Sequence, residues 1–371
     1  MKAIVLEKKD STPLYHDARL TEVPVPTPTE DGQALVKMDA VAFNHREVWI
    51  RKGQYPGIKF GAILGADGVG KVVNVKSGAR KDLVKGDRVL LMPSVGWNAD
   101  PRGPEDASYS ILGGGREPGV FAEYALVHEN NLVKAPDHLS DAEAAALPLA
   151  GLTAWRAVFT KGQVRSGQNV LITGIGGGVA LFALAFCVAA GANVFVTSSD
   201  DSKIVKAVSL GAKGGINYRD ETWGKKIMSV TGNEFLDTVI DGAGGAGMRH
   251  YMAALRPGGV IVSYGMTTGP KVDFTMSAVL KNIEIRGSTM GSRDEFHDMV
   301  SFVQEHKIKP VVSRVWQGLE FSEEAFETMR SGKQFGKLHQ MLRGREIHGC
   351  MTHTLLSATR KSEGPIVVGG A

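Results

Sequence analysis

The sequence is poor in cysteine, since only Cys187 and Cys350 occur among its 371 residues. Two cysteines cannot build the disulfide framework of a small secreted domain, and a chain of this length can bury a sizeable core without one. Cys187 lies inside an apolar segment. The scarcity of cysteine therefore indicates a reducing compartment, and we expect a cytoplasmic protein.

A secretory leader and a membrane-spanning helix are not expected either. The opening residues, MKAIVLEKKD, become polar too early for a signal sequence. Residues Ser166 to Ser199 carry no charged side chain, but glycines divide this run. Its helical part, Val179 to Ala190, is too short to cross a bilayer. We therefore expect no membrane partner.

The charge is nearly balanced, which argues against nucleic acid as a partner. The net charge is +4 and the pI is near 8.9, and lysine and arginine are scattered rather than gathered in a stripe with aromatic residues. The composition, 43% hydrophobic and 22% charged, is ordinary for a globular protein. The length predicts about two domains.

The strongest motif lies between Gln168 and Asp200. A short apolar run, Val170 to Ile172, meets a cluster of glycines and then a run of small and apolar residues. After Gly191 a second β-rich run follows, Val194 to Thr197. This order predicts a βαβ unit with a tight turn before its helix. The first N–H groups of such a helix have no partner within it, and together with the helix dipole they bind anions.

The glycine spacing in that turn is typical of dinucleotide binding. Gly174 allows a sharp turn, Gly177 lets the backbone approach a pyrophosphate, and Ala180 is small enough for the helix to pack on the strand. Gly178 and Val179 complete the predicted cofactor-binding set at this turn. Packing alone is the alternative explanation of a glycine-rich turn, but the two flanking strands favour the cofactor.

The end of the second strand should select the cofactor. Counting 24 residues from Gly174 leads to Ser198, followed by Ser199, with Lys203 one turn into the next helix. Hydroxyls and a cation suit the 2′-phosphate of NADPH, whereas an acidic residue would favour NADH. We expect NADPH, with NADH as the less favoured alternative, because Asp200 and Asp201 would repel a phosphate only if they turned inward.

The remaining pattern predicts an α/β protein with two parts. Up to about Val133 the chain is predicted to be mostly β, with no helix of any length, and Trp97 to Gly119 should form a surface lobe. Ser140-Asp141-Ala142-Glu143 is a capping box that begins an alanine-rich helix. Strands and helices then alternate, which predicts a Rossmann doubly wound parallel sheet of about six strands.

Two strand ends in this sheet are further candidates for cofactor contact. Gly242 follows one strand, and Gly265 and Met266 follow another. Ligands of doubly wound sheets bind at the carboxyl ends of the strands, although a plain turn explains either segment as well.

Four phrases together resemble one family, the medium-chain dehydrogenase/reductases. The branch that is most similar is the zinc-free, quinone-oxidoreductase-like one, often labelled zinc-type alcohol dehydrogenase-like. The resemblance covers roughly Met1 to Leu342. The phrases are Phe43-Asn44-His45-Arg46-Glu47, Leu64-Gly65-Ala66-Asp67-Gly68-Val69-Gly70, Leu147-Pro148-Leu149-Ala150-Gly151-Leu152-Thr153-Ala154-Trp155 and Gly287-Ser288-Thr289-Met290-Gly291-Ser292.

This resemblance implies the domain organisation. A mostly β, GroES-like catalytic domain is expected at 1–133 and 307–343, and a Rossmann dinucleotide-binding domain at 134–306. The family also implies a homodimer. Residues 344–371 form a tail of unknown role.

The resemblance also shows where this chain departs from the zinc-dependent members. Their catalytic metal is bound by a cysteine where this chain has Asn44, a histidine where it has Ala66, and a thiolate near Leu149. Their second zinc is bound by four cysteines in a lobe that corresponds to Trp97–Gly119, which has no cysteine. Tetrahedral zinc sites need several thiolate or imidazole ligands. We therefore expect no metal at either position.

Carry-over from the family supplies the remaining candidates. Asn44 is expected at the catalytic centre as an amide donor. His45 is a candidate proton relay there, although a lone histidine is more often structural. Glu47 and Asp67 are expected more as organisers of the cleft than as proton donors. The alternatives are a turn-satisfying asparagine and a structural histidine. The expected cofactor contacts from the family are Thr153, Tyr218, Thr289, Met290, Gly336 and Lys337. The alternatives are core packing for Tyr218 and Met290, a helix hydroxyl bonded to the backbone for Thr153, and a surface turn for Gly336 and Lys337.

Without a metal to polarise a carbonyl, unactivated alcohols and ketones become poor substrates. Hydride transfer to a carbon conjugated with a carbonyl needs only modest hydrogen-bond donors. We therefore expect an NADPH-dependent oxidoreductase that acts on an activated double bond or a quinone. The alternatives are a metal-free carbonyl or alcohol oxidoreductase and a cofactor-binding protein with little catalysis.

Overall fold

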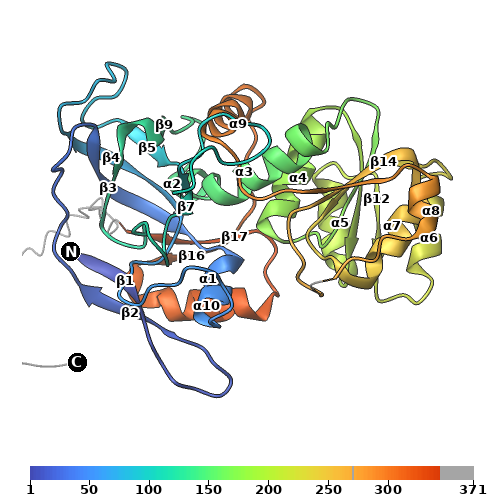
Figure 1. The fold of residues 1–371 in the computed structure, drawn as a ribbon, viewed down its shortest axis with the longest axis horizontal. Helices are drawn as coiled ribbons and strands as arrows, with labels where there is room; N and C mark the ends of the chain where they lie inside the picture. Colours follow the sequence, from blue (N-terminus) through green and yellow to red (C-terminus); the bar gives the residue numbers. More distant parts are fainter. Residues whose placement is uncertain (270, 343–371) are drawn as a thin grey trace, which may run out of the picture.

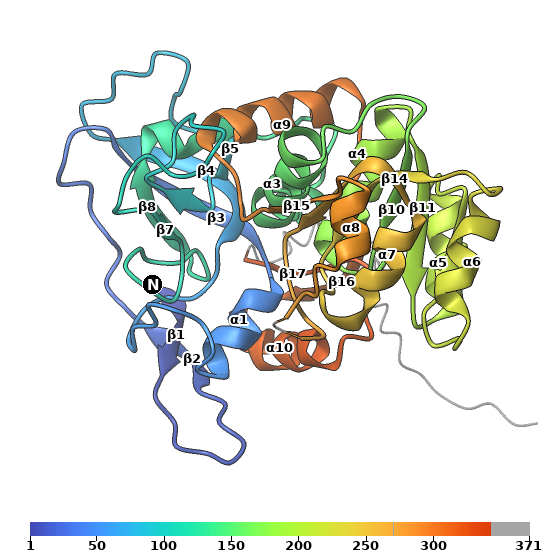
Figure 2. The same ribbon diagram turned by 45° about the vertical axis from the view of Figure 1, so that its right-hand side comes forward.

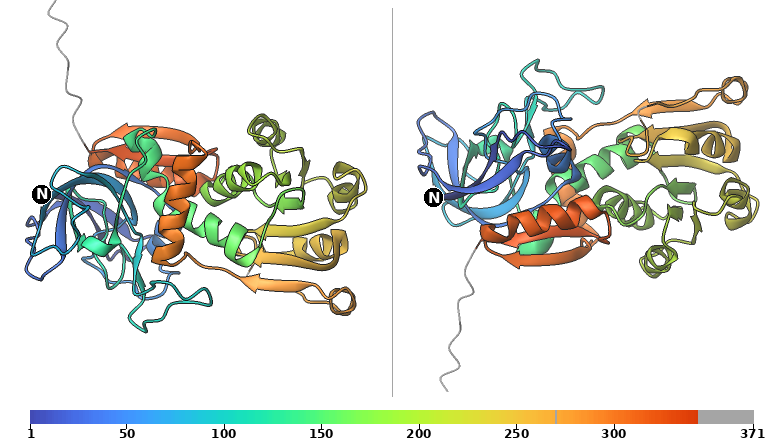
Figure 3. Two further views of the ribbon diagram at one scale, coloured as in Figure 1. Left: turned by 90° about the horizontal axis from the view of Figure 1, so that it is seen from above. Right: turned by 90° about the horizontal axis from the view of Figure 1, so that it is seen from below.

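The computed structural model describes residues 1–269 and 271–342, and two large β-sheets organise it (Figure 1). The expected tail at 344–371 lies outside the described residues. Helices α3 (Pro148–Trp155) and α9 (Arg293–Glu305) lie between the two sheet-bearing parts in the view from above (Figure 3).

The second sheet confirms the predicted Rossmann fold. Its six strands have the order β12-β11-β10-β13-β14-β15, and all neighbouring pairs are parallel. The strand order changes direction between β10 and β13, and doubly wound sheets bind ligands at such a point. The strands are β10 (Asn169–Ile172), β11 (Asn193–Ser198), β12 (Gly214–Asn217), β13 (Leu236–Asp241), β14 (Leu255–Ser263) and β15 (Glu284–Gly287).

Helices pack on the strands of this sheet, as the predicted alternation requires. Figure 2 shows α5 and α6 together at one end of the molecule. The short helix α8 was not predicted, and a π-helical segment, η2, continues α3. The helices of this part are α4 (Gly178–Ala189), α5 (Asp201–Ser209), α6 (Trp223–Val230), η3 (Gly245–Gly247), α7 (Met248–Ala254), α8 (Met276–Leu280) and η2 (Arg156–Lys161).

The first sheet combines strands from both ends of the described chain. Its order is β16-β17-β3-β4-β5-β9, and β8 pairs with β3. Strand β17 (Lys337–Met341) runs antiparallel to β3 (Gln33–Ala42), so that His339 lies opposite Ala42. This pairing brings Lys337 close to the segment that follows β3.

The other strands complete this part of the molecule. β1 pairs with β2, and β6 pairs with β7. The strands are β1 (Lys2–Glu7), β2 (Asp17–Glu22), β4 (Asp67–Val75), β5 (Arg88–Leu91), β6 (Ser94–Val95), β7 (Ser110–Ile111), β8 (Tyr124–His128), β9 (Leu132–Lys134) and β16 (Val312–Gln317). Its short helical segments are η1 (Glu129–Asn131), η4 (Leu319–Phe321) and α10 (Ser322–Ser331).

A helix in the amino-terminal part corrects the expectation that none occurs before Val133. Helix α1 spans His45–Arg51, and Asn44 is its N-cap residue. The Glu47 carboxylate accepts the backbone N–H of Asn44 at 2.7 Å. Val48 and Ile50 are buried and hold the helix against the core. Asn44 and Glu47 have the spacing of a capping box, a signal in the sequence that the β-rich surroundings concealed.

The predicted capping box at Ser140 is confirmed. Ser140 N donates to the Glu143 carboxylate at 2.8 Å, and Glu143 N donates to Ser140 Oγ at 3.3 Å. The resulting helix α2 (Asp141–Ala145) is short. Pro148 begins α3 soon afterwards, at a position where its missing N–H costs no hydrogen bond.

One apolar core runs through the junction of the two parts. It includes Leu152 of α3, Phe186 of α4 and Met299 of α9, together with Ala40 and Ile172 from the two sheets. Protein interiors are close-packed and deform little. This core therefore gives the space between the two sheets a rigid wall.

Candidate active site

A cavity of about 410 Å³ lies between the two sheet-bearing parts. It brings together most of the residues that the sequence proposed, although they come from distant segments. The proposed residues that line it are Asn44, His45, Thr153, Gly174, Gly177, Gly178, Val179, Gly242, Thr289, Met290, Gly336 and Lys337.

The glycine turn forms one wall of the cavity. Gly174 and Gly176 have φ angles of +64° and +117°, a backbone conformation that favours glycine. Gly177 precedes α4 as its N-cap residue, and the twelve-residue helix starts at the cavity. The first N–H groups of α4 and its dipole suit an anion. The turn thus fits the pyrophosphate of a dinucleotide.

At the base of the cavity a lysine is surrounded by oxygen atoms. Lys337 Nζ donates to Asn44 Oδ1 at 2.6 Å, to Asp67 Oδ2 at 2.8 Å and to the Phe43 carbonyl at 2.8 Å. Lys337 is 4% exposed and Asp67 is fully buried. Asp67 also accepts the backbone N–H of Leu149 at 2.6 Å, so it links β4, β17 and α3.

The partners of Asn44 fix the orientation of its side-chain amide. The ammonium of Lys337 can only donate, so it must face Oδ1, and the carboxylate of Asp67 can only accept, so it must face Nδ2. The Asn44 Nδ2 to Asp67 Oδ2 distance is 2.8 Å. Asp67 therefore takes one of the two amide hydrogens, and Asn44 also lines the cavity.

A second buried ion pair lies behind this cluster. Glu47 is fully buried and contacts Arg46 Nη1 at 3.1 Å. Burial raises the pKa of Glu47, while Arg46 and the backbone N–H of Asn44 oppose that rise. Neither Glu47 nor Asp67 lines the cavity. In the structure both carboxylates bind other protein groups, and the organising role expected for them stays a prediction.

Zinc does not fit this arrangement. Asn44, Ala66 and Leu149 stand where the zinc-dependent members supply ligands, and the ammonium of Lys337 occupies the space between Asn44 Oδ1 and Asp67 Oδ2. A dication there would face a fixed positive charge. Within residues 1–269 and 271–342, no group of three or more His, Cys, Asp or Glu side chains could hold a metal ion.

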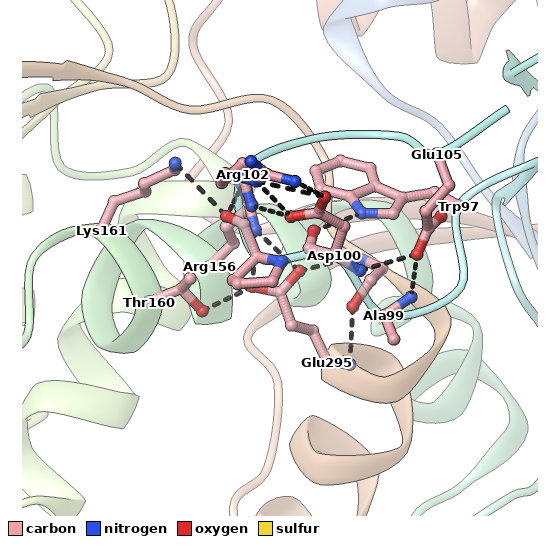
Figure 4. A network of polar contacts seen from close by, with 11 residues as sticks. Trp97, Ala99, Asp100, Arg102, Glu105, Arg156, Thr160, Lys161 and Glu295 are labelled. Atoms are coloured by element: carbon pink, nitrogen blue, oxygen red, sulfur yellow. Dashed lines mark hydrogen bonds and ion pairs between the residues drawn. The ribbon is translucent and has the colours of Figure 1, made fainter. Parts of the chain in front are cut away.

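The lobe between Trp97 and Gly119 is held together by polar contacts instead (Figure 4). The Glu105 carboxylate accepts backbone N–H groups from Asn98 at 2.7 Å and from Ala99 and Asp100 at 2.6 Å each. These hydrogen bonds lower the pKa of Glu105 to about 2. One carboxylate thus closes the turn at the start of the lobe.

An arginine connects this lobe to the junction between the two parts. Arg156 donates to the Pro101 carbonyl at 2.7 Å and to Glu295 of α9 at 2.8 Å. Its guanidinium also lies 4.4 Å from the centre of the Trp97 ring. Figure 4 shows Arg156 between the lobe and Glu295. The contacts of Arg156 therefore connect the lobe to α3 and α9.

Thr153 lines the cavity, and its hydroxyl already has a backbone partner. Thr153 Oγ1 donates to the Leu149 carbonyl at 2.8 Å and lies 3.9 Å from Met290 Sδ. The alternative of a helix hydroxyl bonded to backbone is therefore present in the structure. Thr153 and Met290 still form one wall of the cavity, and their contact with a cofactor stays a prediction.

His45 lies at the rim of the cavity, at the start of α1. Its ring stands edge-on to Trp49, with 5.5 Å between ring centres. Partial burial and the nearby Lys52 lower its pKa. His45 is therefore neutral near pH 7, and a proton-relay role for it stays a prediction.

The segment proposed for NADPH selection lies beside the cavity rather than in it. Ser198 is buried, and Lys203 Nζ donates to the carbonyls of Gly332 and Gln334 at 3.3 and 3.1 Å. Asp200 accepts the N–H of Ser202, and Asp201 accepts from the Asn217 amide. Both carboxylates are thus engaged in local hydrogen bonds.

Several proposed residues do not line the cavity. Tyr218 and Met266 are 45% and 47% exposed. The proposed residues that are absent from its lining are Glu47, Asp67, Ser198, Ser199, Lys203, Tyr218, Gly265 and Met266. Because a bound dinucleotide extends beyond one cavity, the cofactor contacts among them stay predictions.

Tyr264 lines the cavity, although it was not among the proposed site residues. It follows β14, and a Cβ atom at Gly242 would lie 2.6 Å from its hydroxyl. Burial raises the pKa of Tyr264, with a smaller contribution from Asp241. Its location after a strand end was visible in the sequence, but the direction of its side chain depends on the absence of a side chain at Gly242.

Two family models match the chain. The model described as "Alcohol dehydrogenase GroES-like domain" matches residues 30–137, and the one described as "Zinc-binding dehydrogenase" matches residues 178–305. A protein of Leptosphaeria maculans named "Zinc-type alcohol dehydrogenase-like protein YogA" is 45% identical over 339 residues, 88% of this chain and 94% of that protein. An acryloyl-coenzyme A reductase of Sulfurisphaera tokodaii is 30% identical, over 86% of this chain and 95% of that protein.

Solved structures agree with this match. An NAD-dependent alcohol dehydrogenase superposes with a TM-score of 0.82 at 33% identity, over 92% of this chain and 100% of the other. A crotonyl-CoA carboxylase/reductase in complex with NADP superposes with a TM-score of 0.81 at 25% identity, over 92% and 95%.

The chain belongs to the medium-chain dehydrogenase/reductase superfamily. Within it, the protein is an alcohol dehydrogenase-like oxidoreductase that combines a GroES-like domain with a Rossmann domain. In the described part of the chain, no helix is long and apolar enough to cross a membrane.

Proposed function

We propose that the protein is a zinc-free, NADPH-dependent reductase of double bonds conjugated to a carbonyl, including quinones. The observation that carries this proposal is the position of Lys337. Its ammonium lies between Asn44 and Asp67, at the base of the cavity and at the place where zinc-dependent relatives bind their metal. A fixed cation is therefore present without a metal.

The residues of this cluster suit charge that develops on a carbonyl oxygen. When a reduced pyridine nucleotide is bound, it supplies the hydride. Lys337 contributes positive charge at the base of the cavity, and Asn44 lines it with a second amide hydrogen that Asp67 does not use. Preorganised donors in a dry site stabilise an oxyanion strongly. Asp67 balances the charge of Lys337 and holds both side chains in place.

This electrostatic assistance is weaker than that of a metal, which favours activated substrates. In a conjugated carbonyl compound, hydride adds to carbon while the negative charge spreads to the distant oxygen. An unactivated ketone lacks this delocalisation and benefits more from a Lewis acid. Relatives named acryloyl-coenzyme A reductase and crotonyl-CoA carboxylase/reductase support reduction of an enoyl-type substrate.

The preference for NADPH rests on the cations beside the glycine turn. A separate cavity of about 460 Å³ lies beside the glycine turn. It is lined by Lys203, Lys206 and Lys333, together with Asp200 and Ser202. Lys203 also lies close to Gly176 of the turn. Three lysines attract the negatively charged 2′-phosphate of NADPH more strongly than the uncharged ribose hydroxyl of NADH. The neighbour in complex with NADP supports this preference.

We also propose that two copies associate through the end of the Rossmann sheet. Strand β15 pairs only with β14 among the described residues, so its other edge is open. Met276 and Leu280 of α8, the helix that precedes β15 in the chain, are 70% and 77% exposed. An open strand edge with exposed apolar side chains favours pairing with a second copy.

A substrate panel tests the proposed reaction. Purified protein should oxidise NADPH with quinones and neutral enones and should be much slower with aldehydes, ketones and alcohols. Activity should survive treatment with a strong zinc chelator, and metal analysis should find zinc well below one equivalent. Turnover that requires stoichiometric zinc, or tight nucleotide binding without turnover of any panel member, would contradict the proposal.

A further inference from the structure

A second cavity, of about 610 Å³, adjoins the proposed catalytic cavity on the amino-terminal side. Arg46, Tyr55 and Ile111 line both cavities, so the two share a wall. The other lining residues come from the segments 56–59, 107–110 and 114–116. We call this second space the basic annex.

The charge of the basic annex is positive. Its lining includes Arg46, Lys59 and Arg116 and no aspartate or glutamate. Arg46 is balanced by the buried Glu47. The side chain of Arg116 is 63% exposed, and its nearest ion-pair partner is Glu117 at 3.9 Å. For Lys59 no ion pair is found among the described residues.

Arg46 is held as a rigid part of the shared wall. Its Nη1 and Nη2 atoms donate to the carbonyls of Leu112 and Gly113 at 2.8 and 2.9 Å. Its guanidinium lies 4.9 Å from the centre of the Tyr55 ring. Arg46 therefore fixes the passage between the cavities. Lys59, without an ion pair among the described residues, and Arg116, with a long contact to Glu117, keep the lining positive.

Glycines keep the basic annex open on the side of Arg116. Gly114 has a φ of +106°, and a Cβ atom there would lie 2.8 Å from Ile50 Cδ1. A Cβ atom on Gly115 would lie 3.1 Å from the Gly57 carbonyl. The sequence Gly113-Gly114-Gly115 thus lets two loops approach each other without filling the space between them.

The basic annex is separate from the site proposed for the cofactor. The glycine turn, the start of α4, Lys337 and Thr153 line the catalytic cavity and are absent from the lining of the annex. The dinucleotide has its own anion-binding groups there and at the three lysines beside the turn. The charge of the annex is therefore directed at a different anion.

We propose that the basic annex binds an anionic group of the substrate, a carboxylate or a phosphate, remote from the double bond that is reduced. This assignment rests on the proposed function, because it places the conjugated part of the substrate in the catalytic cavity. Lys59 and Arg116 supply the charge, and Tyr55 and Arg46 form the passage. Lys59 and Arg116 thus determine substrate specificity and take no part in the hydride transfer itself.

Matched substrate pairs test the proposal. The first pair is an enone carboxylate and its methyl ester, and the second is an enoyl thioester of coenzyme A and the same thioester of N-acetylcysteamine. A preference for the charged member of the first pair indicates a carboxylate, and a preference in the second pair indicates phosphate. In either case the preference should fall as the salt concentration rises, because exposed charges are screened.

Charge reversal identifies the residues. In the double variant Lys59→Glu, Arg116→Glu, kcat/KM for the preferred charged substrate should fall by about tenfold or more, and for its neutral partner by less than about twofold. Lys85→Glu is the matched control, since Lys85 is exposed and lines neither cavity. It should leave both substrates unchanged.

A binding measurement keeps this test independent of turnover. Coenzyme A and pantetheine, and the enone carboxylate and its ester, are titrated into protein saturated with NADP⁺. If the charged probe binds more weakly to the double variant than to the native protein and the control, the basic annex is supported. This holds even if no substrate is reduced, because the absence of turnover would contradict only the proposed reaction. The annex is contradicted if neutral enones are reduced but charged and neutral members of each pair have equal rates and affinities in every variant. That outcome would still support the proposed reaction.

Discussion

At the scale of single residues, Lys337 decides most about the chemistry of this protein. The sequence predicted a cofactor contact for it, because the segment Phe335-Gly336-Lys337 resembles one that closes over the nucleotide. In the structure Lys337 lines the cavity, yet its ammonium donates to three oxygen atoms of the catalytic cluster. Its stem also lies 2.7 Å from the position of a Cβ atom at Gly178. Lys337 therefore lies between the glycine turn and Asn44.

Replacing Lys337 with methionine should remove the cation while keeping most of the side-chain volume. We expect kcat to fall by about tenfold or more, because the variant loses the positive charge at the cavity and the contact that orients the Asn44 amide. The affinity for NADPH, measured by fluorescence titration, should change much less. Equal kcat in the variant and the native protein would contradict a role for this charge.

The same substitution leaves Asp67 buried without its cation, which costs about 3–5 kcal/mol. The double variant Lys337→Met, Asp67→Asn removes both charges and should regain much of the lost melting temperature. Activity should stay low in the double variant. A return of activity together with stability would show that Lys337 acts only as a structural partner of Asp67.

Lys203 is the residue that tests the choice of cofactor. Lys203→Glu should weaken NADPH much more than NADH, because it replaces a phosphate partner with a repulsive charge. The ratio of the two dissociation constants is the measurement. Lys203 also donates to the carbonyls of Gly332 and Gln334, so Lys203→Met serves as the matched control for loss of those contacts. Unchanged discrimination in Lys203→Glu would show that its charge faces elsewhere.

At the scale of elements, the lobe from Trp97 to Gly119 shows how a segment keeps its shape through polar contacts. Glu105 gathers three backbone N–H groups, and Arg156 attaches the lobe to α9 through Glu295 (Figure 4). Each of these hydrogen bonds is stronger when the carboxylate is charged. The fold of the lobe should therefore depend on the protonation of its acids.

Glu105→Gln should lower the melting temperature at pH 7, because the amide is a weaker acceptor for those N–H groups. The folded pKa of Glu105 is about 2, below its ordinary value of 4.5. A carboxyl whose pKa is lowered by folding stabilises the protein above pH 4.5 and loses that contribution as the pH falls toward 2. The difference in melting temperature should shrink over this range. Glu22→Gln, at an exposed carboxylate outside the lobe, is the control, and a difference that stays constant with pH would contradict this account.

At the scale of the whole molecule, the site exists because two sheets are held against one core. Strand β17 comes from the carboxyl end of the described chain, and β3 and α1 come from the amino-terminal part. The glycine turn belongs to the other sheet. Figure 3 shows α3 and α9 between these parts. No single segment of the chain therefore contains the cavity.

The proposed dimer is also a property of the whole molecule. Light scattering after size exclusion should give a mass near twice 39.6 kDa. Met276→Glu, Leu280→Glu should shift the protein to a monomer, because both side chains are strongly exposed on the helix that precedes β15 and belong to the proposed interface. Val84→Glu, at another exposed apolar side chain, is the control. A native monomer, or an unchanged dimer in the double variant, would contradict this interface.

The sequence by itself determined the elements whose signals are local. The glycines at 174 and 177, the apolar strands around them and the capping box at Ser140 each depend on neighbours within a few residues, and each was predicted. The capping box at Asn44 is equally local, but it was missed because the preceding strand of ten residues suggested only β-structure.

Only the tertiary structure decided which polar groups meet. Asn44 and Lys337 are 293 positions apart in the chain, and Asp67 and Leu149 are 82 apart. A hydrogen bond is a matter of a few ångströms, so contacts at such separations depend on strand register and on helix packing rather than on spacing along the sequence. The same reason explains the basic annex, whose Lys59 and Arg116 become neighbours of one cavity only when their two loops fold together.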